Sequence, residues 1–260
     1  MNILAIETTG KYGSAAVINE EGRITEAVSS EEMNHLRGMI GLIDDALKSA
    51  GTDKNDLTHI AASVGPGSFT GIRIGVTTAR VMAQMLGIPC IAVSSLEGMA
   101  EGVLSDAVSS GALYVVPVIN ARRHQTYAAV YEAEFTAGCE QQMLAPVMEE
   151  KQYMIEELLA DLSGKLGRYE GAKAYFTGDG IDAYAEIIEE ALPEGSYIFA
   201  PEEIRYQLAA PLAGIALRRA KAGRTVSYDM LMPEYMRLAE AEQRLKAGTL
   251  SDRIRKPVQI

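Results

Sequence analysis

The sequence predicts an α/β protein of two similar lobes, each built around a mixed β-sheet with helices on its faces. At 260 residues, of which 48% are apolar and 23% charged, the chain has the length and composition of about two globular domains. Three short strands open the chain, and alternating helices and strands follow. A similar order begins again about 110 residues later. Antiparallel strands followed by alternating α and β units form mixed sheets, so we expect one such sheet in each half.

The first half starts with residues 3–6, an uninterrupted apolar run that is typical of a strand buried on both faces. Gly51 ends one predicted helix, and Gly87 with Pro89 ends the next. In order, we predict strands 3–6, 13–19 and 23–29, helix 34–50, strand 60–64, helix 71–86, strand 90–93 and a helix that begins at Ser94 or Ser95 and runs to 104.

The second half repeats this order of elements without obvious residue identity. We predict strands 113–119, 126–132 and 139–144, helix 151–162, strand 172–177, helix 183–192, strand 197–199 and helix 211–222. Two such halves back to back resemble the ribonuclease-H-like lobes of sugar kinases, Hsp70 chaperones and actin (the ASKHA type), in which a nucleotide lies between the lobes. We expect a first lobe of residues 1–107 plus about 211–222, a second lobe of residues 108–210 and a C-terminal extension of residues 223–260.

Charge and composition exclude several classes of protein. With 24 basic and 35 acidic side chains the net charge is −11, which argues against binding nucleic acid alone, because phosphate binding needs a basic surface. Residues 237–260 are the local exception, with six basic and three acidic side chains, and they either contact RNA in an assembly or form a solvated tail. No apolar run is long enough to span a membrane or to serve as a signal peptide. Cys90 and Cys139 are isolated, so we expect a reduced, cytoplasmic protein.

Two helices of the first half carry more apolar surface than one sheet contact needs. In helix 34–50 the apolar arc spans roughly 160°, wider than the ~100° stripe that packs on a sheet. Helix 71–86 has only two charged residues, Arg73 and Arg80. Either both helices are buried within one lobe, or their spare faces bind a partner polypeptide. Under the second interpretation the candidate interface residues are Met33, Leu36, Met39, Ile40, Ile43, Leu47, Ile72, Arg73, Val76 and Arg80.

A glycine-rich loop, Gly65–Gly75 with the sequence GPGSFTGIRIG, joins a predicted strand to helix 71–86. Such a loop presents backbone N–H groups at the positive end of a helix dipole, and Ser68 or Thr70 can cap the helix. It matches neither the Walker A pattern nor G-x-G-x-x-G, because Thr70 stands where the third glycine would be. Two interpretations stay open: an anion-binding loop, or a tight turn whose glycines let the helix pack close to the strand.

The Gly65–Gly75 stretch closely resembles the signature of the TsaB (YeaZ) family of the tRNA threonylcarbamoyladenosine pathway. Weaker matches occur in the right order at residues 3–9, 34–36, 42–47, 120–122, 177–180 and 233–237. By this resemblance and that of the wider kinase-like superfamily, the possible phosphate or nucleotide turns are formed by Glu7, Thr8, Thr9, Gly65, Gly67, Ser68, Thr70, Asn120, Arg122, Gly178, Asp179 and Gly180. The family usually has Asp-Thr-Ser at residues 7–9 and Asp-Ala-Arg at residues 120–122. Because Asn120 carries no charge, a complete Mg²⁺-nucleotide site in this chain is doubtful.

The resemblance implies a non-catalytic subunit that dimerises with a TsaD-like catalytic subunit and supports a TsaE-like ATPase. That complex uses ATP and Mg²⁺ to transfer a threonylcarbamoyl group to the adenosine beside the anticodon of tRNA. We expect this chain to bind no cofactor itself, to meet tRNA only through the complex and to form a homodimer when alone.

The alternative function is a small-molecule kinase or phosphotransferase of the same superfamily, and the neutral Asn120 counts against it. A metallopeptidase is disfavoured because no two of His35, His59 and His124 are three or four residues apart, as a helical metal pair requires. Ser68 lacks the sequence context of a catalytic nucleophile. We therefore predict neither catalytic residues nor a metal site.

Overall fold

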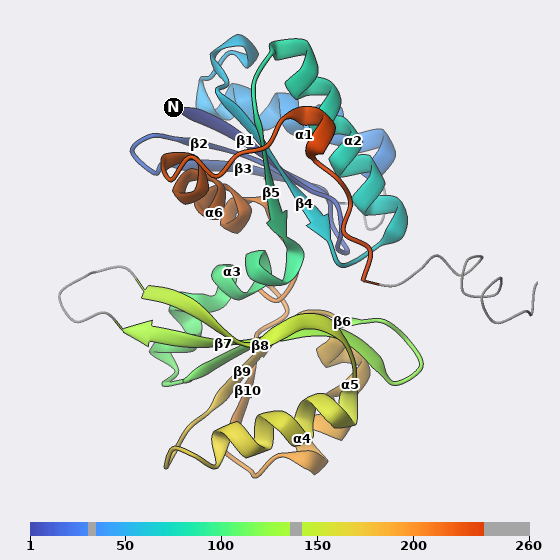
Figure 1. Cartoon of the computed structure of the whole chain (residues 1–260), viewed down its shortest axis with the longest axis vertical. Coiled ribbons are helices and arrows are strands. Elements are labelled where there is room, and N and C mark those ends of the chain that lie inside the picture. The colour runs from blue at the N-terminus through green and yellow to red at the C-terminus, as the bar shows by residue number, and fades with distance from the viewer. Residues whose placement is uncertain (31–34, 136–141, 237–260) are drawn as a thin grey trace, which may run out of the picture.

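A computed structural model describes residues 1–30, 35–135 and 142–236. It consists of two α/β lobes, shown one above the other in Figure 1. The sheet of the first lobe has the strand order β3-β2-β1-β4-β5, with β2 antiparallel and β4 parallel to β1. Its elements, with the helix that leads to the second lobe, are β1 (Asn2–Glu7), β2 (Ser14–Asn19), β3 (Ile24–Val28), α1 (His35–Ala50), η1 (Lys54–Asp56), β4 (His59–Gly65), α2 (Phe69–Leu86), β5 (Cys90–Ser94) and α3 (Ser95–Ser109).

The second lobe repeats this plan, with the strand order β10-β9-β6-β7-β8, β7 antiparallel and β9 parallel to β6. Its elements, with the helix that returns to the first lobe, are β6 (Tyr114–Asn120), β7 (Gln125–Phe135), β8 (Gln142–Met154), α4 (Ile155–Leu166), β9 (Ala174–Thr177), α5 (Gly180–Ala191), β10 (Tyr197–Phe199), α6 (Ala209–Lys221) and η2 (Tyr228–Met230). The predicted repeat of three antiparallel strands and alternating α and β units is therefore confirmed.

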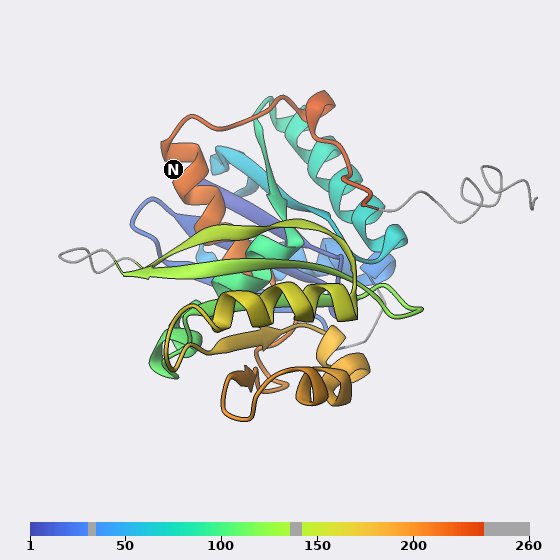
Figure 2. The ribbon, with the colours of Figure 1, turned by 60° about the horizontal axis from the view of Figure 1, so that its bottom comes forward.

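Helices cover both faces of each sheet, which explains why residues 3–6 are apolar without alternation. α1 and α2 pack on the outer face of the first sheet, and α4 and α5 on the outer face of the second. α3 and α6 lie side by side between the sheets, where Gly98 and Gly102 leave room for Leu212 and Pro211 (Figure 2). α6 packs on the inner face of the first sheet, whereas α3 packs on the second. The expected boundary at residue 107 is thus wrong for α3, whose apolar face is buried against β6 and β7.

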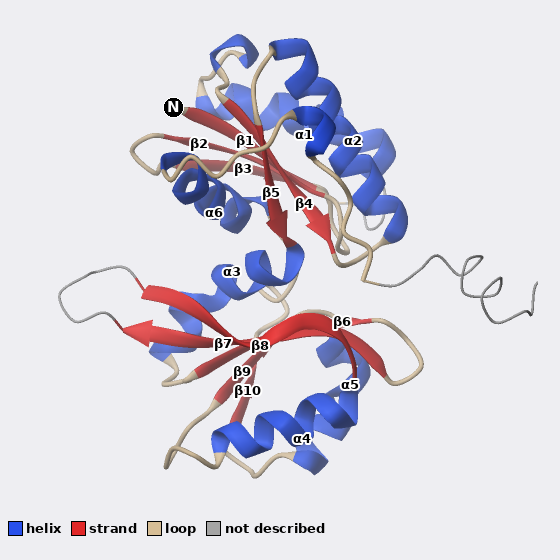
Figure 3. Ribbon diagram, viewed as in Figure 1, coloured by secondary structure: helices blue, strands red, loops and turns tan. Residues whose placement is uncertain are grey.

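The predicted helix 151–162 is also corrected. Residues Lys151 to Met154 continue β8, and helix α4 begins only at Ile155 and ends at Leu166. Figure 3 shows β8 as a strand and α4 as a helix. Lys151 pairs with Ala128 of β7, and Tyr153 is buried in the core of the lobe. Cross-strand pairing and burial outweigh the helical preference of the local composition here.

Residues 223–236 do not form a separate extension, because they run along the first lobe. Val226 forms an antiparallel bridge with Cys90, which covers the free edge of β5, and Leu231 is completely buried. The Glu234 N–H then donates to the Val64 carbonyl at the end of β4. The predictions for Met33, Cys139 and residues 237–260 concern positions outside the described residues. Among the helices that the structure describes, none combines the length and the apolar character needed to cross a bilayer.

Candidate functional site

The candidate turn after β1 lies where the parallel strands β1 and β4 end, beside the point where the strand order reverses. Open α/β sheets bind ligands at this position. Here the turn is buried: Glu7 and Thr8 are completely inaccessible, and Thr9 is almost so. Oε1 of Glu7 accepts hydrogen bonds from the backbone N–H and the hydroxyl of Thr9, at 2.5 and 2.6 Å. The Thr9 hydroxyl lies 3.0 Å from that of Ser95, so the polar groups of the turn bind one another rather than face solvent.

The second carboxylate oxygen of Glu7, Oε2, has no hydrogen-bond partner although it is buried. Burial raises the pKa of Glu7, an effect that the hydrogen bonds from Thr9 only partly oppose. A buried, unpaired oxygen costs least when the carboxyl group is protonated, because the neutral form needs no counter-charge. Burial therefore favours the neutral form of the Glu7 carboxyl group in this arrangement.

The glycine-rich loop packs directly on this turn. A Cβ added at Gly67 would lie 2.6 Å from the Thr9 carbonyl oxygen, and one at Gly71 would lie even closer to that of Thr8. The Ser68 N–H donates to the Thr9 carbonyl, and the Ser68 side chain caps α2 by accepting from the Gly71 N–H. Two loop donors are thus already used within the protein. The geometry favours the interpretation of a tight turn in which glycines allow close packing of helix and strand.

Gly65 and Thr70 lie on either side of the Gly67–Ser68 turn of this loop. Gly65 has a φ of 118°, in the region open to glycine, and its missing side chain leaves room for the Glu234 carbonyl of the C-terminal segment. Thr70 lies in the first turn of α2 and is exposed. The loop therefore connects three segments that are distant in sequence, the turn after β1, helix α2 and residues 232–236.

The turn after β6 is held differently. The Asn120 N–H donates to Oδ1 of Asp179 at 3.0 Å, and Oδ1 of Asn120 accepts from the Arg122 N–H and the Tyr184 hydroxyl. Gly178 and Gly180 pack against the Val118 carbonyl at the end of β6. The structure thus brings together Asn120, Arg122 and Asp179. Asn120 and Arg122 are exposed, and residues 122–124 all have positive φ.

Two positions in these turns, Glu7 and Asn120, offer no accessible carboxylate to Mg²⁺. Glu7 points into the core, and the side-chain oxygen of Asn120 is a neutral amide already bound by two donors. Such sites usually hold Mg²⁺ through one or two accessible carboxylates and the substrate phosphates. Within the described ranges, no group of three or more His, Cys, Asp or Glu side chains could hold a metal ion.

The candidate interface residues separate into buried and exposed groups. Five of them are in the core of the first lobe, where α1 and α2 cover the sheet, and cannot contact a partner there: Met39, Ile43, Leu47, Ile72 and Val76. That part of the interface prediction is wrong, because the wide apolar arcs pack on the sheet and on each other. Ile40 is 67% exposed on α1, and Arg73 and Arg80 are accessible on α2. Leu36 lies in the first turn of α1.

Two exposed apolar residues of α2 were absent from the predicted interface. Val81 and Met85, four residues apart on α2, are 48% and 81% exposed. Arg73 stacks on Phe69, 3.9 Å from the ring centroid, and its Nε donates to the Tyr235 hydroxyl at 2.9 Å. The spacing of Val81 and Met85 could have revealed them, whereas the contact with Tyr235 joins residues 162 positions apart and left no local signal.

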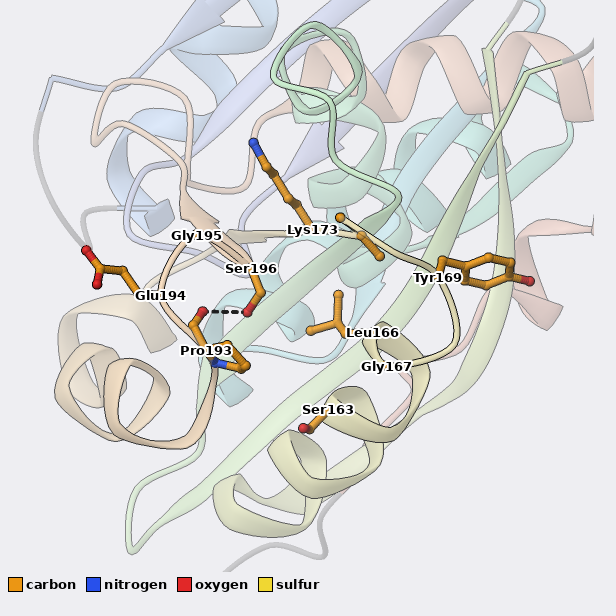
Figure 4. Close-up of a pocket in the computed structure, with 11 residues that line it drawn as sticks. Ser163, Leu166, Gly167, Tyr169, Lys173, Pro193, Glu194, Gly195 and Ser196 are labelled. Carbon is orange, nitrogen blue, oxygen red and sulfur yellow. Dashed lines mark hydrogen bonds between the residues drawn. The ribbon is translucent and has the colours of Figure 1, made fainter.

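A hollow of about 360 Å³ in the second lobe lies away from these turns (Figure 4). The end of α4, residues 169–173 and residues 193–196 line it, so it opens at the amino ends of β9 and β10. The Ser196 hydroxyl donates to the Pro193 carbonyl and closes the turn that forms one wall. Ligand sites in parallel sheets lie at the carboxyl ends of the strands, so we assign no function to this hollow.

The model of the TsaD family, tRNA N6-adenosine threonylcarbamoyltransferase, matches residues 25–245. The TsaB protein of Bacillus subtilis (strain 168) is 30% identical over 93% of this chain and 96% of its own length. The chain belongs to the TsaB (YeaZ) family. TsaB of Escherichia coli (strain K12) is 28% identical over 91% of this chain and 95% of its own. The predicted family is therefore confirmed.

The fold of this TsaB-family chain is confirmed by a solved structure as well. YeaZ from Pseudomonas aeruginosa superposes with a TM-score of 0.72 at 24% identity, covering 90% of this chain and 99% of the other. Both TsaB relatives are named as tRNA threonylcarbamoyladenosine biosynthesis proteins.

Proposed function

We propose that this chain is a non-catalytic subunit of a complex that forms threonylcarbamoyladenosine in tRNA. The observation that carries the proposal is the match, over more than nine-tenths of both chains, to TsaB proteins named for this biosynthesis. The buried Glu7 and the neutral Asn120 favour an accessory role for this chain over a catalytic one. The chain works in the cytoplasm, beside a TsaE-like ATPase, and the ATP and Mg²⁺ of the reaction are used by the complex.

Its partner is a TsaD-like catalytic subunit, which binds the outer face of α1 and α2 through the exposed Ile40, Val81 and Met85. Two helices of this length suit one half of an interface of ordinary size, about 1,600 Å² in total. Binding there favours the active conformation of the partner if that conformation has the higher affinity. The same face forms a homodimer when the partner is absent, and tRNA is met only through the complex.

The test is co-purification with the TsaD-like subunit, followed by a tRNA modification assay with and without this chain. Modification should require this chain together with the TsaD-like subunit. Ile40→Asp and Met85→Asp should weaken pairing by at least about tenfold, because they place a charge in a desolvated contact. Met143→Asp is the matched control, since Met143 is 58% exposed but lies on β8 of the second lobe. Pairing that survives both helix variants, or fails in the control, contradicts the assigned face.

A second measurement addresses the cofactor. If the isolated chain binds no nucleotide, Mg-ATP should leave its Tm unchanged, whereas occupancy at 100 times Kd would add about 2.7 kcal/mol of stability. A clear increase in Tm together with phosphotransfer to a small molecule would support a kinase and contradict the proposal.

A further inference from the structure

A hollow of about 400 Å³ lies where three segments that are distant in sequence meet. These segments are the turn between β1 and β2, which contributes Tyr12, the end of β3, which contributes Val28, and the connection from β10 to α6. The hollow is separate from the buried Glu7 turn and from the outer face of α1 and α2. Nothing in the proposed function makes use of it.

Its lining combines aromatic, apolar and acidic groups. The rings of Tyr12 and Tyr206 meet edge to face, with centroids 5.9 Å apart at 75°. Val28 and Leu208 supply apolar surface, and the carboxylates of Glu202 and Glu203 are exposed at the wall. Burial and the negative charge of Asp182 raise the pKa of Tyr206 above its ordinary value.

The protein already holds one positive charge against these groups. The ammonium of Lys11 lies 5.3 Å from the ring centroid of Tyr12 and 5.1 Å from that of Tyr206, within the range of cation–π attraction. It also lies 4.0 Å from Oε1 of Glu202. The same rings and carboxylate therefore bind a cation within the chain, and the adjoining hollow offers space for a second one.

The charge of the hollow decides the class of ligand. Two carboxylates line it, those of Glu202 and Glu203, whereas the nearby Asp182 is paired with Arg205 at 2.7 Å. Against Lys11 this leaves an excess of negative charge, which repels phosphate groups and attracts cations. A guanidinium group stacks on aromatic faces and pairs with carboxylates in the same plane, so it suits this lining better than an ammonium does.

We propose that the hollow formed by Tyr12, Tyr206, Glu202 and Glu203 binds the guanidinium of an arginine side chain from a partner protein. This inference does not rest on the proposed function, because it concerns a different surface and a different test. Tyr206 supplies the ring face, and the two glutamates supply charge at the rim.

The test is an NMR titration of the full chain, following its tyrosine signals, with N-acetyl-arginine methylamide. The neutral isostere N-acetyl-citrulline methylamide serves as the control ligand. We expect saturable binding of the arginine compound and at least about tenfold weaker binding of the citrulline compound, because only the charge differs. Tyr206→Leu should weaken binding of the arginine compound by about tenfold, and Glu203→Gln by about two- to fivefold. Tyr169→Leu, at a tyrosine 53% exposed in the second lobe, should change nothing.

Lys11→Gln gives the sharpest outcome. Removing the internal cation should strengthen binding of the arginine compound severalfold, because a competitor for the same groups is lost. Weaker binding in this variant would overturn the proposal, and so would the absence of saturable binding in the unchanged protein. Equal binding of adenosine would assign the hollow to stacking of a nucleobase instead. Glu203→Gln keeps the proposal testable if Tyr206→Leu does not fold.

Discussion

The turn after β1 and the turn after β6 occupy the same place in the repeated order, yet they are stabilised by opposite means. In the first, Glu7 and Thr8 are buried, and Gly71 of α2 packs against the Thr8 carbonyl. In the second, Asn120 and Arg122 are exposed, and three successive residues other than glycine have positive φ. One copy of the turn has become part of a core, while the other remains on the surface and is held by Asp179.

The difference shows that a shared topology does not give the two turns the same surroundings. Residues that would meet a phosphate group in a kinase-like protein pack against the chain itself in the first lobe. Four substitutions test this contrast.

Gly71→Ala should have the largest effect. Its Cβ would collide with the Thr8 carbonyl oxygen, a backbone atom that cannot move without disturbing the turn. We expect a loss of about 3 kcal/mol or more in the free energy of unfolding, measured by urea denaturation. Gly41→Ala is the matched control, because a Cβ there meets no atom within 4 Å. The free energy of unfolding of the control should rise by about 0.5–1 kcal/mol, because alanine has a higher helix propensity than glycine. Equal stability of the two variants would refute the close packing.

Asp179→Ala tests the second turn. It removes the acceptor of the Asn120 N–H, so the free energy of unfolding should fall by about 2 kcal/mol. Glu186→Ala, at an exposed position of α5, should stay within about 0.5 kcal/mol of the unchanged protein. If Asp179→Ala lowers the free energy of unfolding no more than this control does, Asp179 does not stabilise the turn.

Glu7→Gln tests the buried acid through pH. Because burial raises the pKa of Glu7 in the folded protein, the folded form keeps a proton that the unfolded form has released above about pH 4.5. Stability should therefore fall as pH rises from the unfolded pKa to the raised one, and stay lowered above it. In the glutamine variant the free energy of unfolding should no longer fall with pH, and at pH 8 it should exceed that of the unchanged protein by on the order of 1 kcal/mol. Urea denaturation between pH 4 and 9 measures both, and an unchanged slope would show that Glu7 ionises normally.

Arg123→Gly should have the smallest effect. Arg123 has a φ of 56°, which glycine adopts without steric cost. Glycine removes this backbone strain, but it also raises the conformational entropy of the unfolded chain, which offsets most of the benefit. We therefore expect the free energy of unfolding to rise by about 0.5 kcal/mol. Arg168→Gly, at an exposed loop residue outside the left-handed region, should instead lose stability by a similar amount. A loss in both variants would mean that the second turn carries no strain.

Much of the fold could be predicted from local patterns. The apolar run at residues 3–6, the stops at Gly51 and Gly87 and the repeated order of elements all reappear in the structure. The prediction failed at Lys151–Met154, where pairing with β7 extends a strand into a helix-like composition. It failed again at Ile72 and Val76, because an apolar helix face does not reveal whether it packs on its own sheet or on a partner.

The candidate site divides in the same way. The sequence indicated the glycines of the loop and the turn residues Glu7 and Asn120. It could not indicate that Gly71 lies against Thr8, since that contact joins residues 63 positions apart. The cluster of Lys11, Tyr12 and Tyr206 was not predicted either, because Tyr206 lies almost two hundred residues after the other two.

By itself, the sequence determined where most helices and strands begin and end and that their order is repeated, since these features depend on backbone preferences and periodicity among neighbouring residues. Only the tertiary structure decided that α3 covers the sheet of the second half, that Glu7 is enclosed, and that Ile40 rather than Val76 faces outward. Burial depends on contacts between segments far apart in the chain, and no local pattern encodes which of those segments will meet.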